Sequence, residues 1–347
     1  MTAKKDAASS SVKTVNLALQ GGGAHGAFTW GVLDRLLEEK KLAFEGVSAT
    51  SAGAMNAAAL TYGLTLGGCE GARESLFDLW QGISQAAQYS PLQSSPIDRM
   101  LKDYSLRISP AFAIFDLMTR IMSPYEFNPM NMNPLRDVLL QTVDFDVLRR
   151  ADCPIKLFLS ATNVRTGKVR IFAREEITAQ AVLASACLPF LFQAVEIGGE
   201  AYWDGGYMGN PALFPLIYNC QHPDILIVHV NPLNRPDVPR TATEIMNRIN
   251  EISFNSSLMR EMRAISFVTK LVDDGKILDD SLKRIYIHAI NDDKLMSNLG
   301  VASKLNADWG FLIHMRDAGR AKAETWLAEN FAKIGTESTV DIHARYL

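Results

Sequence analysis

The sequence has few cysteines, and their placement excludes two classes of protein. Its four cysteines are scattered, and none forms a C-x-x-C pair, so neither a zinc site nor a disulfide framework is indicated. We expect reduced and mostly buried thiols, no metal site and no cofactor. The cysteines are Cys69, Cys153, Cys187 and Cys220.

The sequence also lacks runs of like charge and long apolar segments. The 347 residues carry a net charge of −3, and duplex binding usually requires a basic footprint, so we expect no nucleic acid as partner. No apolar run reaches the ~18 residues of a membrane-spanning helix. The polar start MTAKKDAASSSVK lacks the apolar core of a secretory signal. We therefore predict a cytoplasmic protein with a disordered tail over residues 1–13.

Strand-like and helix-like runs alternate along the rest of the chain. Strands are expected at 14–20, 44–50, 155–164, 169–173, within 194–206, and at 225–232 and 284–290; helices are expected at 26–41, 52–64, 240–274 and 306–334. This alternation predicts an α/β fold, with a mainly parallel central sheet flanked by helices on both faces. We predict one domain over residues 14–347.

Residues 86–134 depart from this alternation. They are rich in proline, methionine and aromatic residues, and a long irregular apolar insertion often serves as a lid or a binding surface. The alternative is a satellite hydrophobic cluster packed on the sheet. Both interpretations stay open.

The stretch LALQGGGAHGAF, residues 17–28, is typical of a strand, a tight glycine turn and the start of a helix. Gly21, Gly23 and Gly26 satisfy the G-x-G-x-x-G pattern of dinucleotide-binding sites. A dinucleotide site also needs an acidic residue at the end of the second strand, but that strand ends at Thr50 and Ser51. An oxyanion hole for a hydrolase is therefore the better hypothesis for the turn.

The second expected strand runs into VSATSAGAMNAA, with Ser51 between strand and helix. This is the setting of a nucleophile elbow, G-x-S-x-G, with Ala49 in place of the first glycine and Gly53 as the second. Small residues are needed there because the turn is sharp, and the helix N-terminus favours a developing negative charge. The alternative is that Ser51 only caps the helix.

The third motif is YWDGGYMGNPAL, in which Asp204 ends a strand before two glycines. Asp-Gly-Gly alone is usually a turn, but beside a serine elbow Asp204 is a candidate general base. A serine needs an adjacent base, and an aspartate pKa near ~3.9 is low for that task. Burial by Trp203 and Tyr207 would raise it.

The ordered set GGGAHGA, TSAG and DGG resembles the patatin-like phospholipase family over about residues 14–235. The resemblance implies a three-layer α/β sandwich and an acyl hydrolase with a Ser–Asp dyad. Ser51 would be the nucleophile, Asp204 the base, and the amides of Gly21, Gly22 and Gly23 the oxyanion hole.

His25 is a departure from this family, because it stands where Arg or Lys is common. A neutral histidine can still donate one hydrogen bond; the alternative is an exposed residue in the first helical turn. A Ser–His–Asp triad is also open from chain order, since histidines follow Asp204. Among them are His222, His229, His288 and His314, of which His229 and His288 alternate with aliphatic residues and are expected in the core or on the sheet.

The resemblance implies cleavage of lipid carboxylic esters, such as phospholipids or lysophospholipids, through an acyl-enzyme at a lipid, membrane or granule surface. Phe115 and Met118, within the apolar segment 110–134, are candidates for contact with the acyl chain. Storage polyester or another hydrophobic ester is the alternative substrate. A non-catalytic lipid-binding or scaffold protein on the same fold is the third hypothesis. Head group, chain length and homo-oligomer formation stay open.

Overall fold

A central eight-stranded sheet organises the computed structural model, which describes residues 12–88, 90, 92, 104, 109–276 and 282–347. The strand order is β5-β6-β3-β2-β1-β7-β8, and β4 pairs with β3. The strands are β1 (Lys13–Leu19), β2 (Leu42–Ala49), β3 (Lys156–Asn163), β4 (Val169–Ala173), β5 (Val195–Ile197), β6 (Glu200–Asp204), β7 (Asp224–Val228) and β8 (Tyr286–Ile290).

Five neighbouring strands, from β3 through β2, β1 and β7 to β8, run parallel, while β4, β5 and β6 are antiparallel to their neighbours. The predicted α/β fold class with a mainly parallel sheet is therefore confirmed. Every residue of β7 is buried, as expected for a strand covered on both faces. Strand β1 begins at Lys13, which the sequence places in the tail, and residues 1–11 of that predicted tail lie outside the described residues.

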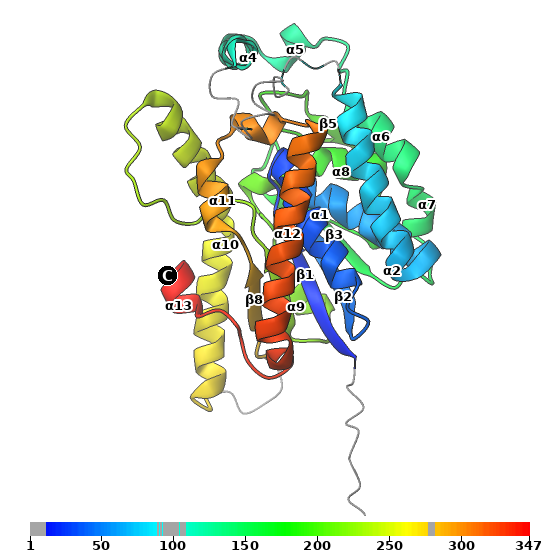
Figure 1. The fold of residues 1–347 in the computed structure, drawn as a ribbon, viewed down its shortest axis with the longest axis vertical. Coiled ribbons are helices and arrows are strands. Elements are labelled where there is room, and N and C mark those ends of the chain that lie inside the picture. Colours follow the sequence, from blue (N-terminus) through cyan, green and yellow to red (C-terminus); the bar gives the residue numbers. More distant parts are fainter. Residues whose placement is uncertain (1–11, 89, 91, 93–103, 105–108, 277–281) are drawn as a thin grey trace, which may run out of the picture.

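Helices cover both faces of the sheet (Figure 1). The helices are α1 (Gly26–Leu37), α2 (Ala52–Ala86), α4 (Pro110–Ile121), α5 (Pro124–Phe127), α6 (Pro134–Thr142), α7 (Phe145–Leu148), α8 (Ala179–Ser185), α9 (Phe214–Asn219), α10 (Ala242–Asp273), α11 (Asp293–Asn298), α12 (Trp309–Asn330) and α13 (Ile342–Tyr346). In β1, Leu17 and Leu19 pack in the cluster with α1, α2 and α12, whereas Ala18 packs in the cluster with α9, α10 and α13. This alternation follows from the two-residue period of a strand.

Helix α2 extends well beyond the predicted segment 52–64. It is interrupted at Gly67 and Gly68, whose φ values of −137° and 61° are not helical. The predicted helix thus corresponds to the first of two helical segments. Gly63 and Gly71 let these segments approach closely, because a Cβ on Gly63 would collide with the Gly71 carbonyl.

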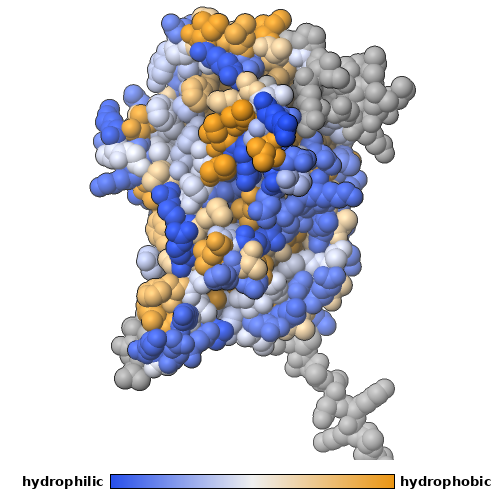
Figure 2. Space-filling model, turned by 90° about the vertical axis from the view of Figure 1, so that its left-hand side faces the viewer, coloured by the Kyte–Doolittle hydropathy of each residue, from blue (hydrophilic) through white to orange (hydrophobic). Residues whose placement is uncertain are grey.

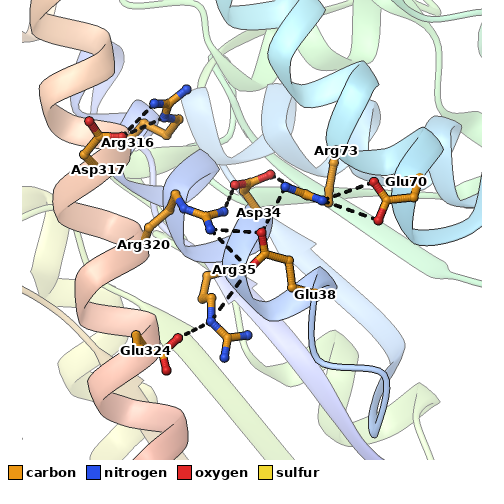
Figure 3. Close-up of polar contacts among 9 residues, drawn as sticks. All are labelled: Asp34, Arg35, Glu38, Glu70, Arg73, Arg316, Asp317, Arg320 and Glu324. Atoms are coloured by element: carbon orange, nitrogen blue, oxygen red, sulfur yellow. Dashed lines mark hydrogen bonds and ion pairs between the residues drawn. The ribbon is translucent and has the colours of Figure 1, made fainter.

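The long helix α12 is fixed against α1, the helix that follows the glycine turn. A Cβ on Gly31 would collide with the Arg316 carbonyl, so the two backbones cross closely there. Charged side chains extend the contact: Arg320 pairs with Asp34 and Glu38, and Arg35 pairs with Glu324 (Figure 3). The segment just before α12 is consequently held near the glycine turn. In the part of the chain described here, no helix is long and apolar enough to cross a bilayer.

Candidate active site

Ser51 lies in a strained turn between β2 and α2. Its φ of 56° and ψ of −123° are unusual for a residue with a side chain, and such conformations cost about 1–3 kcal/mol. Only small neighbours fit: a Cβ on Gly21 would lie 2.6 Å from Ser51 Cβ, and one on Gly53 would collide with the Leu19 carbonyl. The Ser51 hydroxyl makes no capping hydrogen bond to α2. The geometry is that of a nucleophile elbow and not of a helix cap.

Asp204 is fully buried at the end of β6. Its Oδ1 accepts a hydrogen bond from the Gly206 amide at 2.7 Å, and its backbone carbonyl accepts one from Thr162 Oγ1 at 2.8 Å. Oδ2 is buried without a hydrogen bond of ordinary geometry to the residues described. Burial raises the pKa of Asp204 from 3.8 to about 6, so the carboxyl titrates within reach of neutral pH.

Three groups lower the pKa of Asp204 and so oppose the effect of burial. The largest of these effects is a hydrogen-bonding interaction with the Ser51 side chain, followed by the Gly206 amide and the positive charge of Lys304. Since Oδ2 has no bond of ordinary geometry, the interaction with Ser51 is loose. Catalytic hydrogen bonds are often long before substrate binds. The structure therefore brings the two predicted residues Ser51 and Asp204 together.

The glycine turn is held by two asparagines. The Gly21 amide donates to Asn210 Oδ1 at 2.7 Å, and the Gly21 carbonyl accepts from Asn231 Nδ2 at 2.7 Å. The amide of Gly21 is thus already engaged, which removes it from the predicted oxyanion hole. For the amides of Gly22 and Gly23, the described part of the chain provides no hydrogen-bond acceptor.

His25 is buried, so the interpretation as an exposed residue is wrong. Its Nε2 lies 2.8 Å from Ser303 Oγ, and its ring meets Phe311 edge-on. Burial, together with the charge of Lys304, lowers the pKa of His25 well below 6.5. The imidazole is therefore neutral, and the glycine turn itself carries no positive side chain.

A lysine that sequence reasoning missed lies beside the turn. Lys304 belongs to a 3₁₀ turn before α12 and is half-buried. Its ammonium donates to Asn231 Oδ1 at 2.7 Å, and a Cβ on Gly23 would collide with its carbonyl. Burial lowers the pKa of Lys304 to about 8. A single lysine in VASKLNADWG carries no motif, so only the tertiary contact reveals it.

The four candidate histidines of a triad are engaged elsewhere. His229 and His288 are buried, with Nε2 atoms 2.7 Å from Tyr346 Oη and 2.9 Å from Asp224 Oδ1, which confirms the predicted core role of both. His222 Nδ1 lies 2.7 Å from Glu45 Oε2, and His314 stacks on Tyr104. None of these contacts involves Ser51 or Asp204.

The predicted insertion contributes helices α4 and α5 at the top of the molecule (Figure 1). Residues 89, 91, 93–103 and 105–108 of the insertion lie outside the described residues. Phe115 and Met118 are half-buried on α4, whereas the adjacent face exposes Ile114 (70%), Leu117 (58%) and Ile121 (72%). Figure 2 shows the apolar surface gathered at this end of the molecule. Contact of Phe115 and Met118 with an acyl chain stays a prediction.

The connection between this apolar end and the sheet runs through the loop after α8. Gln193 Nε2 donates to the Asn128 carbonyl at 2.9 Å, and the Ala194 amide donates to Tyr125 Oη at 3.3 Å. The same loop leads directly into β5, the strand that pairs with β6. The apolar end is therefore tied to the strand that carries Asp204.

Among the described residues, no group of three or more His, Cys, Asp or Glu side chains is arranged to hold a metal ion.

Comparisons with known proteins bear on this site. A family model described as patatin-like phospholipase matches residues 17–217. The search of curated proteins found no match. Among solved structures, VipD from Legionella pneumophila is similar at 16% sequence identity and a TM-score of 0.38, over 91% of this chain and 67% of that one. The family match includes Ser51, Asp204 and Asn210, but Asn231 and Lys304 lie beyond it.

Proposed function

We propose that this chain, which belongs to the patatin-like phospholipase family, is a serine hydrolase that cleaves lipid carboxylic esters through an acyl-enzyme. The observation that carries the proposal is the pairing of Ser51, held at φ 56°, with a buried carboxyl of pKa about 6. A strained serine elbow is costly to keep, and a base is most effective when its pKa lies near the working pH.

In the proposed reaction, Ser51 Oγ attacks the ester carbonyl carbon while Asp204 Oδ2 accepts the hydroxyl proton. The amides of Gly22 and Gly23 donate to the oxygen that becomes negative, and one such donor is typically worth about 10²–10³ in rate. Asp204 then returns the proton to the leaving alcohol oxygen. In the second half, Asp204 accepts a proton from the water that attacks the acyl carbon. It then returns this proton to Ser51 Oγ as the bond from Ser51 to the acyl carbon breaks, which releases a carboxylic acid.

A further observation supports a hydrophobic ester as substrate. The α4 face of Ile114, Leu117 and Ile121 is exposed, and an apolar patch on a surface often marks a site for lipid or protein. We assign it to contact with a lipid surface that holds phospholipid or lysophospholipid. A non-catalytic scaffold on this fold would not require the strain at Ser51 or the burial of Asp204.

A fluorophosphonate probe tests the proposal directly, because it reacts only with an activated serine. We expect the probe to label Ser51 in the wild type and not in Ser51→Ala, as mapped by peptide mass spectrometry. A panel of phospholipid, lysophospholipid, triglyceride and polyester substrates then identifies the ester class, with Ser51→Ala as the control. Labelling of a different serine would overturn the assignment of the nucleophile.

A further inference from the structure

A line of hydrogen bonds behind the glycine turn connects Lys304 to the proposed oxyanion hole. The Lys304 ammonium donates to Asn231 Oδ1, and Asn231 Nδ2 donates to the Gly21 carbonyl, both at 2.7 Å. The Asn231 backbone amide is itself fixed, because it donates to Gln20 Oε1 at 3.1 Å. The three side chains and the turn therefore form one connected network.

The peptide group between Gly21 and Gly22 transmits this network to the site. A trans peptide is planar, so its carbonyl and its N–H point in opposite directions. When Asn231 holds the Gly21 carbonyl, it also sets the direction of the Gly22 N–H. Hydrogen bonds in such a line polarise one another, and a bond from a charged donor is stronger than one from a neutral donor. A positive charge at Lys304 therefore makes the Gly22 N–H a better donor.

We propose that Lys304 and Asn231 are positioning residues that orient and polarise the Gly21–Gly22 peptide, so that the Gly22 amide stabilises the oxyanion formed at Ser51. This inference rests on the proposed hydrolase function. It assigns part of the site to chain beyond residues 17–217, the segment that matches the family. Neither residue touches the reacting atoms; both act through the peptide.

The charged groups around Lys304 leave its positive charge available to the site. Glu251 of α10 interacts with Lys304 but is already paired with two arginines. Arg235 Nε lies 3.0 Å from Glu251 Oε2, and Arg248 Nη1 lies 3.2 Å from the same oxygen. His25 is neutral. Within the described parts of the chain, Asp204 is the other acidic group that interacts with Lys304, and the Lys304 charge in turn lowers the pKa of Asp204. Loss of this charge thus affects both the donor and the base.

The pH dependence of hydrolysis distinguishes this role from a structural one. The pKa of Lys304 is lowered to about 8, so its charge is present below that pH and is lost above it. The pKa of Asp204 is raised to about 6, so the base is ionised above that pH. For the wild type on a short neutral soluble ester, we expect kcat to fall below about pH 6 and again above about pH 8.

The test compares Lys304→Met, Lys304→Arg and Asn231→Leu on that ester. Lys304→Met should lower kcat roughly tenfold, less than loss of an oxyanion donor itself, with KM nearly unchanged. In its pH profile of kcat, the fall on the acid side (the acid limb) should move to higher pH, and the fall on the alkaline side (the alkaline limb) should disappear. Lys304→Arg should keep the acid limb and lose the alkaline one, because arginine stays charged. Asn231→Leu should lower kcat with the acid limb in place.

Several outcomes would overturn the proposal. One is a folded Lys304→Met with wild-type kcat and both limbs, even if its thermal midpoint falls. If the Lys304 variants do not fold, the wild type decides: a kcat without a decline above pH 8 contradicts the role. Failure of the underlying function looks different, because the wild type would then neither hydrolyse esters nor label at Ser51, and the inference would fall with it.

Discussion

Ser51 and Asp204 reach the same level of the sheet from two strands that do not pair with each other. Strand β3 lies between β2 and β6; Ala49 pairs with Leu159, and Asp204 pairs with Ala161. Ser51, two residues beyond Ala49, therefore lies level with Asp204. Because β6 runs antiparallel to β3, the carboxyl end of β6 meets β3 at Ala161, toward the carboxyl end of β3. Proton transfer from Ser51 to Asp204 depends on this register.

Ser51→Ala should abolish ester hydrolysis and probe labelling, because the neighbouring hydroxyl in the turn, that of Thr50, is engaged with the Gly209 carbonyl at 2.6 Å. Its thermal midpoint should stay close to that of the wild type. Ser51→Gly is the matched variant: it should be equally inactive but more stable, because glycine relieves a φ of 56°, a strain worth about 1–3 kcal/mol. Thermal unfolding of the three proteins checks this. An unchanged midpoint in Ser51→Gly would show that the elbow stores no strain.

Asp204→Asn should reduce kcat/KM by several orders of magnitude, because an amide accepts no proton from Ser51. In the wild type, kcat/KM should fall as the pH drops through about 6, since burial raises the pKa of Asp204 to that value and only the carboxylate is a base. Activity on a soluble ester between pH 4.5 and 7.5 measures this limb. His222→Ala and His229→Ala should remain active when folded; an equal loss in either would restore the triad hypothesis.

The glycine turn offers a pair of substitutions with different expected outcomes. In Gly21→Ala the new methyl would lie 2.6 Å from Ser51 Cβ and 3.0 Å from the Thr50 carbonyl, so it should displace the nucleophile and lower kcat strongly. In Gly22→Ala the methyl would meet Val230 Cγ2 at 2.7 Å, away from Ser51. Gly22→Ala should therefore be milder, and adding Val230→Ala should restore activity. A double variant no better than Gly22→Ala would contradict this geometry.

Particular elements show how far the sequence predicts this fold and site. Strand β4 was predicted as 169–173 and is found at Val169–Ala173, because the turn residues before it define its start. The end of the helix after Ser51 was misjudged, since a second helical segment follows Gly67 and Gly68. The engaged Gly21 amide and the position of Lys304 beside the turn have no local signal. They depend on Asn210, Asn231 and the packing of α12, which bring together residues far apart in the chain.

Glu261 on α10 should make stability depend on pH. It accepts hydrogen bonds from the Leu213 and Phe214 amides at 2.9 and 2.8 Å, yet burial raises its pKa from 4.5 to about 7. The folded protein therefore binds this proton more tightly than the unfolded chain, and that stabilisation, complete below pH 4.5, is lost as the pH rises through 7. Glu261→Gln keeps an acceptor oxygen without the charge. Its thermal midpoint should exceed that of the wild type by more at pH 8.5 than at pH 5; a difference independent of pH would contradict this.

The apolar end of the molecule allows a lipid-contacting role to be separated from a packing role. Ile114 and Leu117 are exposed on α4, so replacing both with serine should leave the thermal midpoint and the hydrolysis of a short soluble ester unchanged. Hydrolysis of phospholipid vesicles should fall, because each apolar side chain that enters a lipid surface contributes about 1.5–3 kcal/mol. Two such losses correspond to about a hundredfold or more in membrane binding.

Phe115 and Met118 lie half-buried on the same helix, and replacing both with serine tests whether they contact the acyl chain. If they do, hydrolysis of long-chain esters should fall while a short soluble ester is spared and the thermal midpoint holds, because the lost contacts are made with the substrate and not with the protein. Leu140→Ser on α6, exposed but away from α4, is the control and should change neither activity. Equal loss on short and long esters with a lowered midpoint would instead assign Phe115 and Met118 to the packing of α4.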